Sequence, residues 1–373
     1  MKRWSAVVVA AFLLGLAVLG WGWRLWTGPG IRPEQAAGSK ATVQVRIPQG
    51  MTLTAAADSL SAAGLLKHPT VFLIGAKLTG KTRALRAGLY ELPQGASPRE
   101  LLWAVTSGTA VQVKVTIPEG LDADNVADIL AGALGFSRDD FLTVADSLVI
   151  AAARQGQLLR PGQSAAGHDS LLAGESARHP RRFRWCEGHL ACDTFLFAEG
   201  TEAATAAQFL VSTQWARMDS LFAGSPAAAE LGFAPLDLLT LASIVEAEAR
   251  LDDERPLIAA VYVNRLRQGW RLEADPTVAY ILKKKGQRLF YRDLDVFSPF
   301  NTYRNQGLPP GPIGNPGPAA LEAAARPDSS CRAMYFVSDG QGGHVFSLTA
   351  REHEAAVQEF RKARASGNGQ RND

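Results

Sequence analysis

Near the N-terminus, residues 4–23 form an uncharged apolar stretch that decides where the rest of the protein lies. A helix rises about 1.5 Å per residue, so about 20 residues span the roughly 30 Å hydrocarbon core of a bilayer. Lys2 and Arg3 precede the stretch, and basic residues favour the cytoplasmic side. We predict a cytoplasmic tip and a transmembrane anchor at 1–26, with the remainder outside the cytoplasm. The alternative, a cleaved signal peptide, would need a cleavage site at 36–38, far from the apolar stretch.

The composition is that of a globular protein, with 47% hydrophobic residues and a formal net charge of only +3. Because the charge is small and dispersed, we expect no nucleic acid partner, and we interpret the basic runs 181–184 and 283–285 as solvated surface. Cys186 and Cys192 could close a disulfide outside the cytoplasm and leave Cys331 unpaired, or all three cysteines could be free. The sequence does not decide between these two states.

Residues 75–82 match the phosphate-binding pattern G-x-x-x-x-G-K-[ST] letter by letter. A functional P-loop needs its Lys-Thr pair to open a long helix whose N-terminus holds the phosphates. Here Gly88 follows soon afterwards, and residues 88–92 have the pattern of a strand. We therefore predict a helix over 69–78 that stops before Gly80, and no phosphate site.

A strand, a Pro-Gly turn and a helix occur twice in the first part of the chain. The two turns are Ile47-Pro-Gln-Gly50 and Ile117-Pro-Glu-Gly120, and each follows an alternating β-branched strand. Two further strands, 334–337 and 344–346, flank a glycine-rich turn. The predicted fold class is α+β. The predicted parts are a linker at 27–40, a βααβ module at 41–115, a connecting region at 116–230 with a mobile insertion near 154–180, a mainly helical catalytic domain with a few β-strands at 231–364, and a disordered tail at 365–373.

A helix predicted at 235–250 carries the most informative carboxyl groups of the chain. Glu246 and Glu248 lie roughly 80° to either side of its apolar stripe. Either side chain could lean into a cleft, or both could be solvated, and helical geometry does not choose between them. No histidine or cysteine spacing indicates a metal site and no G-x-S-x-G motif indicates a serine nucleophile, so we expect neither metal nor cofactor.

The segments after this helix are rich in rigid and hydrogen-bonding residues. The loop 307–317 carries many prolines and glycines, which suits a fixed loop lining a groove. Several polar side chains suit a sugar polymer, although Asp275 could cap a helix and Asn301 could bond to loop backbone. The candidate substrate-binding residues are Asn264, Glu273, Asp275, Asn301, Thr302 and Tyr303.

In these segments the chain resembles the endolytic murein transglycosylase (YceG-like) family. The motifs are L-A-S-I-V-E-A-E at 241–248, V-Y-V-N-R-L at 261–266, D-P-T-V at 275–278, N-T-Y at 301–303, the loop 307–317 and G-G-H-V-F at 342–346. The resemblance extends from about residue 43 to residue 360. Cys192 and Phe195 replace a proline and a tyrosine that are usual in the family, and Glu273 stands where glutamine is common.

The resemblance implies a single-pass protein of the plasma membrane that has a LysM-like module and acts outside the cytoplasm. It implies a lytic transglycosylase that cleaves the MurNAc–GlcNAc bond, leaves 1,6-anhydro-MurNAc ends and terminates glycan strand elongation. Glycan strands of peptidoglycan are the implied partner, with peptidoglycan synthases as candidate partners. Glu246 is the implied catalytic residue, held uncharged on its apolar helix face; it protonates the leaving oxygen and then removes the proton of the muramyl 6-hydroxyl. The alternatives are a catalytically silent, membrane-anchored peptidoglycan-binding scaffold, or a hydrolase that pairs Glu246 with Glu273 or Asp275.

Overall fold

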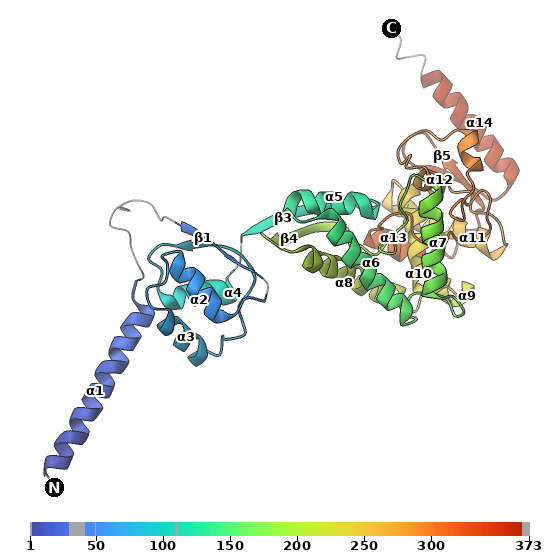
Figure 1. Cartoon of the computed structure of the whole chain (residues 1–373). Coiled ribbons are helices and arrows are strands. Elements are labelled where there is room, and N and C mark those ends of the chain that lie inside the picture. Colours follow the sequence, from blue (N-terminus) through green and yellow to red (C-terminus); the bar gives the residue numbers. More distant parts are fainter. Residues whose placement is uncertain (1, 30–41, 49, 109–110, 368–373) are drawn as a thin grey trace. The chain divides into compact units, whose positions relative to one another are not determined.

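The computed structural model describes residues 2–29, 42–48, 50–108 and 111–367, without the side chains of residues 2–11 and 364–367. The chain divides into two units. Unit 1 comprises Met1–Lys114 and Leu196–Glu202, and unit 2 comprises Val115–Phe195 and Ala203–Asp373. Figure 1 labels elements of both units.

Unit 1 begins with helix α1 (Lys2–Thr27), drawn in blue in Figure 1. Within the part of the chain that the structure describes, no helix meets the length and hydropathy expected of a membrane span. The predicted anchor at 4–23 lies partly outside that part, because the side chains before Phe12 are not described. The predicted linker at 27–40 falls mostly on residues 30–41, which also lie outside it.

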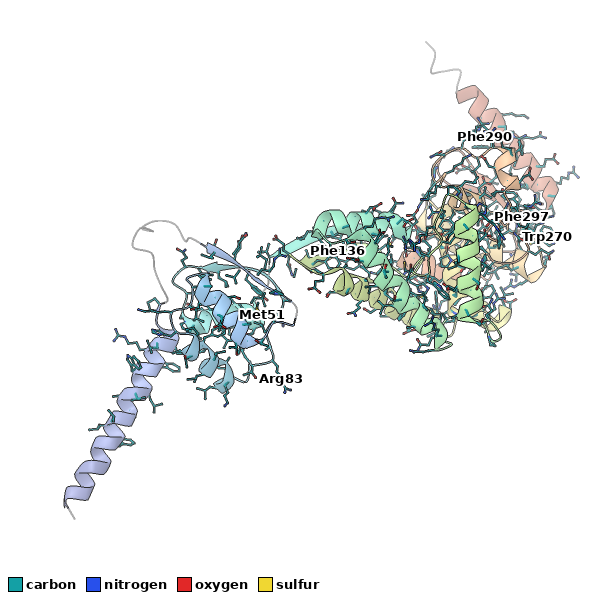
Figure 2. All side chains as sticks on the ribbon, viewed as in Figure 1. Met51, Arg83, Phe136, Trp270, Phe290 and Phe297 are labelled. Carbon is teal, nitrogen blue, oxygen red and sulfur yellow. The ribbon has the colours of Figure 1, made fainter. Side chains whose placement is uncertain are left out.

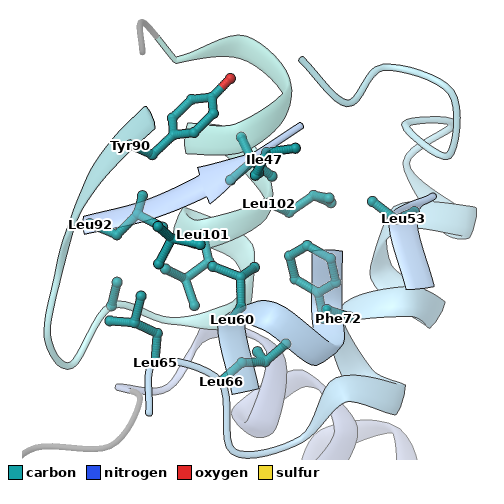
Figure 3. Packing of buried hydrophobic residues seen from close by; sticks show 14 of the residues in the cluster. Ile47, Leu53, Leu60, Leu65, Leu66, Phe72, Tyr90, Leu92, Leu101 and Leu102 are labelled. Carbon is teal, nitrogen blue, oxygen red and sulfur yellow. The ribbon is translucent and has the colours of Figure 1, made fainter. Parts of the chain in front are cut away.

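The rest of unit 1 is a small module in the predicted strand–helix–helix–strand order. Strands β1 (Thr42–Ile47) and β2 (Gly88–Pro93) are antiparallel, with Thr42 opposite Pro93 and Ile47 opposite Gly88. Helices α2 (Leu53–Ala62) and α3 (Pro69–Leu78) lie between them in sequence, and α4 (Pro98–Ser107) follows. Side chains from all five elements fill one core, in which Ile47, Leu60, Phe72, Leu92 and Leu101 are fully buried (Figure 3).

Helix α3 confirms the predicted helix over 69–78, and Gly80 follows it with φ +69°. Lys81 comes after the helix and does not open one; its Nζ donates to the hydroxyls of Thr106 (3.2 Å) and Ser107 (2.7 Å). A methyl group at Gly75 would overlap the ring of Trp26 from α1. The residues that match the P-loop pattern therefore have structural roles.

The chain passes from one unit to the other within two strands, β3 (Gln112–Ile117) and β4 (Asp193–Ala198). Strand β3 pairs with β4, which the sequence analysis did not predict. In unit 2, helices α5 (Ala123–Leu134), α6 (Arg138–Arg154) and α8 (Ala203–Phe222) pack together, with α6 in contact with both of the others. Asp122 caps α5 by accepting the N–H of Asn125 at 2.9 Å.

The predicted insertion near 154–180 is wrong in its secondary structure, because most of it forms helix α7 (Ala165–Arg178). Ser164 caps the helix by accepting the N–H of Gly167. Only Leu172 and Glu175 are buried, and the Glu175 carboxylate accepts the hydroxyl proton of Ser298. Because the buried face is this narrow and contains a glutamate, the sequence shows no apolar period there.

Helix α10 (Pro235–Glu248) forms the centre of unit 2 and packs against α8, α11 (Arg255–Arg267), α12 (Asp275–Ile281) and α13 (Pro318–Ala325). Every residue from Leu238 to Val245 is buried, so the predicted single apolar stripe is wrong. A helix that is surrounded by other elements is buried on all faces. Three shorter elements complete this region: α9 (Pro226–Leu231) and the 3-10 helices η1 (Asp252–Glu254) and η2 (Tyr291–Asp295).

The C-terminal part of unit 2 confirms the predicted pair of strands. Strands β5 (Tyr335–Ser338) and β6 (His344–Ser347) are antiparallel, with Tyr335 opposite Ser347. Helix α14 (Ala350–Gly367) follows and runs past residue 365, where the predicted tail begins; residues 368–373 lie outside the described part. The mixture of many helices with a few small sheets agrees with the predicted α+β class.

Candidate active site

Two segments distant in sequence meet beside the end of α10: the turn after β3 and the loop before α13. Asn315 joins them, because its C=O accepts the N–H of Gly120 (2.7 Å) and its own N–H donates to the C=O of Leu121 (2.8 Å). The buried Asn315 side chain also accepts the N–H of Leu190 and donates to Leu121. Residues 311–317 are all buried, so this part of the predicted fixed loop is held on several sides.

Glu246 lies in the last turn of α10 and faces this junction. Its Oε2 accepts the N–H of Gly317 (3.1 Å), and its Oε1 accepts a hydrogen bond from Nη2 of Arg255 (3.2 Å). The Glu246 side chain is only 9% exposed. The prediction of apolar surroundings for Glu246 is therefore wrong, because α11 places the Arg255 guanidinium against its carboxylate.

A second carboxyl group, Glu119, lies beside the first. Glu119 occupies the Pro-Glu-Gly turn and is exposed. A methyl group at Gly317 would overlap the Glu119 carboxylate, and a Cβ at Gly120 would lie 3.3 Å from Cγ of Glu246. Partial burial and then the negative charge of Glu246 raise the pKa of Glu119, against the lowering effect of Arg255. Two carboxyl groups of unlike environment thus contact the same glycine.

Glu248 faces a different surface, a cleft of about 670 Å³. Its carboxylate accepts the hydroxyl proton of Tyr262 at 2.9 Å. Burial raises the pKa of Glu248 to about 7, with Asp275 adding to the increase. The other residues that line the cleft are mostly polar: Asp122, Arg181, Ala247, Arg250, Asp275, Pro276, Ala279, Tyr280, Lys285, Gly286, Gln287, Arg288, Leu289 and Ile313.

Glu246 does not line this cleft, but one residue connects the two places. Lys285 lines the cleft, and its Nζ donates to the C=O of Gly120. Gly120 in turn lies against Glu246. The pair formed by Glu119 and Glu246 therefore lies at the edge of the cleft, next to Lys285.

Three of the predicted substrate-binding residues lie at or near the surface. The hydroxyl of Tyr303 donates to Oδ1 of Asp275 at 2.6 Å, and Asp275 lines the cleft with Glu248. Burial, together with Asp275, raises the pKa of Tyr303. The carboxylate of Glu273 lies 3.7 Å from Nη1 of Arg265, and Glu273 has φ +51°. The structure thus brings Asp275 and Tyr303 together and pairs Glu273 with Arg265.

The other three predicted substrate-binding residues serve the fold. Asn264 is 7% exposed and donates to the C=O of Cys331 and Ala333. Asn301 is fully buried and donates to the C=O of Leu294 and Val296, as its alternative interpretation required. The buried hydroxyl of Thr302 accepts the N–H of Ala274. Their side chains are engaged with backbone groups and do not line the cleft that contains Glu248, which corrects the prediction.

Behind the site lies a buried cluster that the sequence analysis did not find. Glu187 accepts the N–H of Ala123 (2.9 Å) and the hydroxyl proton of Tyr280 (3.0 Å). Arg181 pairs with Asp122 at 2.7 Å and lies 3.9 Å from Glu187. Burial raises the pKa of Glu187 to about 8 even though Arg181 acts to lower it. The basic run 181–184 is therefore not all solvated surface, since Arg181 and Arg184 are buried.

The stability of the Glu187→Gln variant relative to that of the wild type is expected to increase as the pH rises. Since the pKa of Glu187 is raised to about 8, the native state binds more protons than the unfolded state between about pH 4.5 and 8, and stability falls across that range. A glutamine side chain does not titrate, and because it has a single acceptor oxygen, it loses part of the hydrogen bonding of Glu187 equally at every pH. The melting temperature of the Glu187→Gln variant minus that of the wild type should increase by a few degrees from pH 5 to pH 8. A difference that stayed constant or decreased would contradict the assigned pKa.

Two features of the site were missed from the sequence. Arg255 gave no signal, because a single arginine near a helix start is common. Glu119 did have a signal in the sequence. The two Pro-x-Gly turns differ at their middle position, where the first carries Gln49 and the second carries Glu119. The cysteines, which the sequence left undecided, are free, and Sγ of Cys192 donates to the C=O of Asn315.

Comparison with known proteins agrees with this arrangement. A sequence profile described as the YceG-like family matches residues 45–359. The chain belongs to the YceG-like family. A protein of Bacillus subtilis (strain 168) named endolytic murein transglycosylase is 30% identical to this YceG-like chain over 324 residues, which cover 86% of both chains. A protein of the same name from Streptococcus pneumoniae (strain ATCC BAA-255 / R6) is 30% identical over 338 residues, which cover 87% of this chain and 59% of the relative.

The fold of this YceG-like chain also resembles a solved structure. The crystal structure of a yceG-like protein from Listeria monocytogenes aligns with a TM-score of 0.53 and 28% sequence identity. The alignment covers 85% of this chain and 99% of the Listeria chain. The motifs that carry the resemblance, including Glu246 and Glu248 of α10, lie within the region that the family profile matches.

Proposed function

We propose that this YceG-like chain is an endolytic murein lytic transglycosylase, which cleaves the bond between MurNAc and GlcNAc and leaves a 1,6-anhydro-MurNAc end. The observation that carries the proposal is the position of Glu246, the residue that the family resemblance implies. It lies at the end of a fully packed helix, is held by the N–H of Gly317 and by Arg255, and has a second carboxyl group beside it. Relatives named endolytic murein transglycosylase support the same activity.

The reaction requires two proton transfers at one sugar. The leaving glycosidic oxygen must gain a proton, and the muramyl 6-hydroxyl must lose one as its oxygen attacks C1 of the same ring. An internal nucleophile is already in position, so no water needs to be activated. In the scheme with one carboxyl group, Glu246 performs both transfers, first as acid and then as base.

The cleft next to this pair supplies groups that suit a glycan with acidic substituents. Asp275 and Tyr303 offer hydrogen bonds, and Lys285 and Arg288 offer positive charge. Phe290, which is labelled in Figure 2, follows the cleft residue Leu289 and is 49% exposed. The guanidinium groups of Arg288 and Arg292 lie over its ring. Exposed aromatic rings bind sugar faces through apolar contact, so we propose that the strand lies along this wall.

The proposal includes a location for the protein, which is supported by the sequence of its N-terminal stretch. The uncharged stretch 4–23 would anchor the chain in the plasma membrane, with the catalytic unit outside the cytoplasm. The βααβ module would bind glycan in the manner of a LysM domain, and cleavage of nascent strands beside peptidoglycan synthases would end their elongation. Recovery of the full chain in the soluble fraction after cell lysis would contradict the anchor.

A specific observation favours one alternative function, that of a hydrolase. A hydrolase uses two carboxyl groups, one as acid and one as base or nucleophile, and Glu119 and Glu246 form such a pair. Neither Glu273 nor Asp275 is held against Glu246 by any contact among the described residues, so the pairing first considered from the sequence has less support. The two functions differ in their products, since a hydrolase leaves reducing ends.

Digestion of purified murein by the full-length protein in detergent tests the proposal. The released muropeptides are separated and weighed. A lytic transglycosylase gives muramyl ends that are one water lighter than reducing ends, and internal cuts give fragments of many lengths. Reducing ends alone would indicate a hydrolase. Binding of murein without any cleavage would indicate the silent scaffold.

A further inference from the structure

We propose that Glu119 is a second catalytic carboxyl group, which donates the proton to the leaving glycosidic oxygen while Glu246 receives the proton of the 6-hydroxyl. This inference rests on the proposed function and divides its two proton transfers between two side chains. It gives Glu119 a role that the single-carboxyl scheme does not, and it changes the expected behaviour of variants at positions 119 and 317.

The geometry gives each carboxyl group a different access to substrate. Glu246 is almost enclosed and has both oxygens engaged, one by the N–H of Gly317 and one by Arg255. Glu119 is exposed, and its carboxylate accepts no hydrogen bond from the residues that the structure describes. A proton donor must reach the substrate and must not be committed to another partner, which favours Glu119.

The charges around the pair favour the protonated form of Glu119 and place a cation against the Glu246 carboxylate. Arg255 contacts Glu246 directly and stabilises it as a carboxylate. Glu119 then meets a negative neighbour, and two adjacent carboxyl groups do not both ionise freely. Two other charged groups act on Glu119: Asp252 opposes its ionisation and Arg217 favours it. The Nζ of Lys285 donates to the C=O of Gly120, the residue after Glu119.

The reaction then proceeds without any co-reactant. The Glu119 carboxylic acid gives its proton to the glycosidic oxygen as the C1–O bond breaks, so GlcNAc leaves as an alcohol. The muramyl O6 bonds to C1, and its proton passes to the Glu246 carboxylate. The products are the alcohol and the 1,6-anhydro ring, with Glu119 ionised and Glu246 protonated. A proton transfer from Glu246 to Glu119 restores the starting state, and no water is consumed.

The Glu119→Gln variant tests whether Glu119 donates the proton to the leaving group, because glutamine has no such proton to give. On murein, Glu119→Gln is expected to lower kcat about a hundredfold or more. On a GlcNAc-MurNAc disaccharide with 4-methylumbelliferone as leaving group, which leaves without a proton, the loss should be less than about tenfold. The fall of activity at high pH, which ionisation of Glu119 causes, should also disappear in the variant. Glu322→Gln, at an exposed carboxyl group of α13, is the matched control and should behave as the wild type.

A second variant tests the position of Glu119 without removing its charge. Gly317→Ala introduces a methyl group where the Glu119 carboxylate lies, and φ at Gly317 is −78°, which alanine adopts freely. The carboxyl group must move, so activity on murein should fall about tenfold or more. Gly311→Ala, in the same loop, meets no atom within 4 Å and serves as control. In a Glu119→Ala background, Gly317→Ala should have no further effect if it acts through Glu119 alone.

The outcomes distinguish the two proposals. If the wild type yields no anhydro ends, the proposed function fails. If the wild type yields them and Glu119→Gln cleaves murein at the wild-type rate, the function stands and the role of Glu119 is refuted. An equal loss on murein and on the aryl glycoside, with an unchanged pH profile and melting temperature, would also refute proton donation by Glu119, because a purely structural role affects both substrates alike.

Discussion

Replacing Glu246 with glutamine is expected to reduce murein cleavage by about a hundred- to ten-thousandfold while leaving the fold intact. The glutamine carbonyl can still accept the N–H of Gly317, and Arg255 keeps its second partner, Asp252. What is lost is a group that can take up a proton. The rate of anhydro-muropeptide release, measured with a melting temperature on the same sample, checks both parts of this prediction.

Glu248→Gln is the matched control, because it changes a carboxyl group two residues away on the same helix. A glutamine there can still accept the hydroxyl proton of Tyr262, so the cleft wall is kept. Glu248 is the α10 carboxyl whose pKa rises to about 7, and by that criterion alone it would be chosen as the acid. If Glu248→Gln abolished cleavage and Glu246→Gln did not, the family resemblance would have selected the wrong glutamate of the pair.

Local sequence patterns predicted the elements whose formation depends on few neighbours. The limits of α3 follow from Pro69 at its start and Gly80 beyond its end, and both signals act within one turn of the helix. Strand β1 alternates because one face of its small sheet is buried, and this alternation is visible without the partner; β2 alternates only from Tyr90 onward. Strands β5 and β6 are predicted instead by their β-branched and aromatic residues and by the glycine-rich turn between them.

The predictions that failed concern environments created by residues far away in sequence. Glu246 was expected in apolar surroundings, but the countercharge comes from Arg255 on the next helix, and its proximity depends on how α10 and α11 pack. Asn264 and Asn301 have the residue type of sugar ligands, yet buried backbone carbonyls occupy them. Glu119 lies beside Glu246 only because Asn315 joins their segments. Sequence gives the type of a side chain, while its partner is fixed by tertiary packing.

Arg181 is the sharpest example of this limit, and its replacement has the largest expected effect on stability. The two arginines at 181 and 182 are neighbours in sequence, but Arg181 is 5% exposed and Arg182 is exposed. Nη2 of Arg181 binds Asp122, its Nε donates to the C=O of Tyr280 (2.6 Å), and its guanidinium group lies over the ring of Tyr280. Burial acts to raise the pKa of Asp122, but Arg181 lowers it overall, so Asp122 is charged at neutral pH.

Arg181→Met is therefore expected to lower the free energy of unfolding by about 3–5 kcal/mol at pH 7, because Asp122 is left without its countercharge inside the protein. Arg182→Met removes the same charge at the next position and should change it by less than about 0.5 kcal/mol. Urea unfolding of both variants at pH 7 measures the difference. The loss from Arg181→Met should shrink at low pH, where Asp122 can be protonated in both states and no longer requires the arginine. Equal effects of the two substitutions would mean that the cluster around Glu187 does not depend on Arg181.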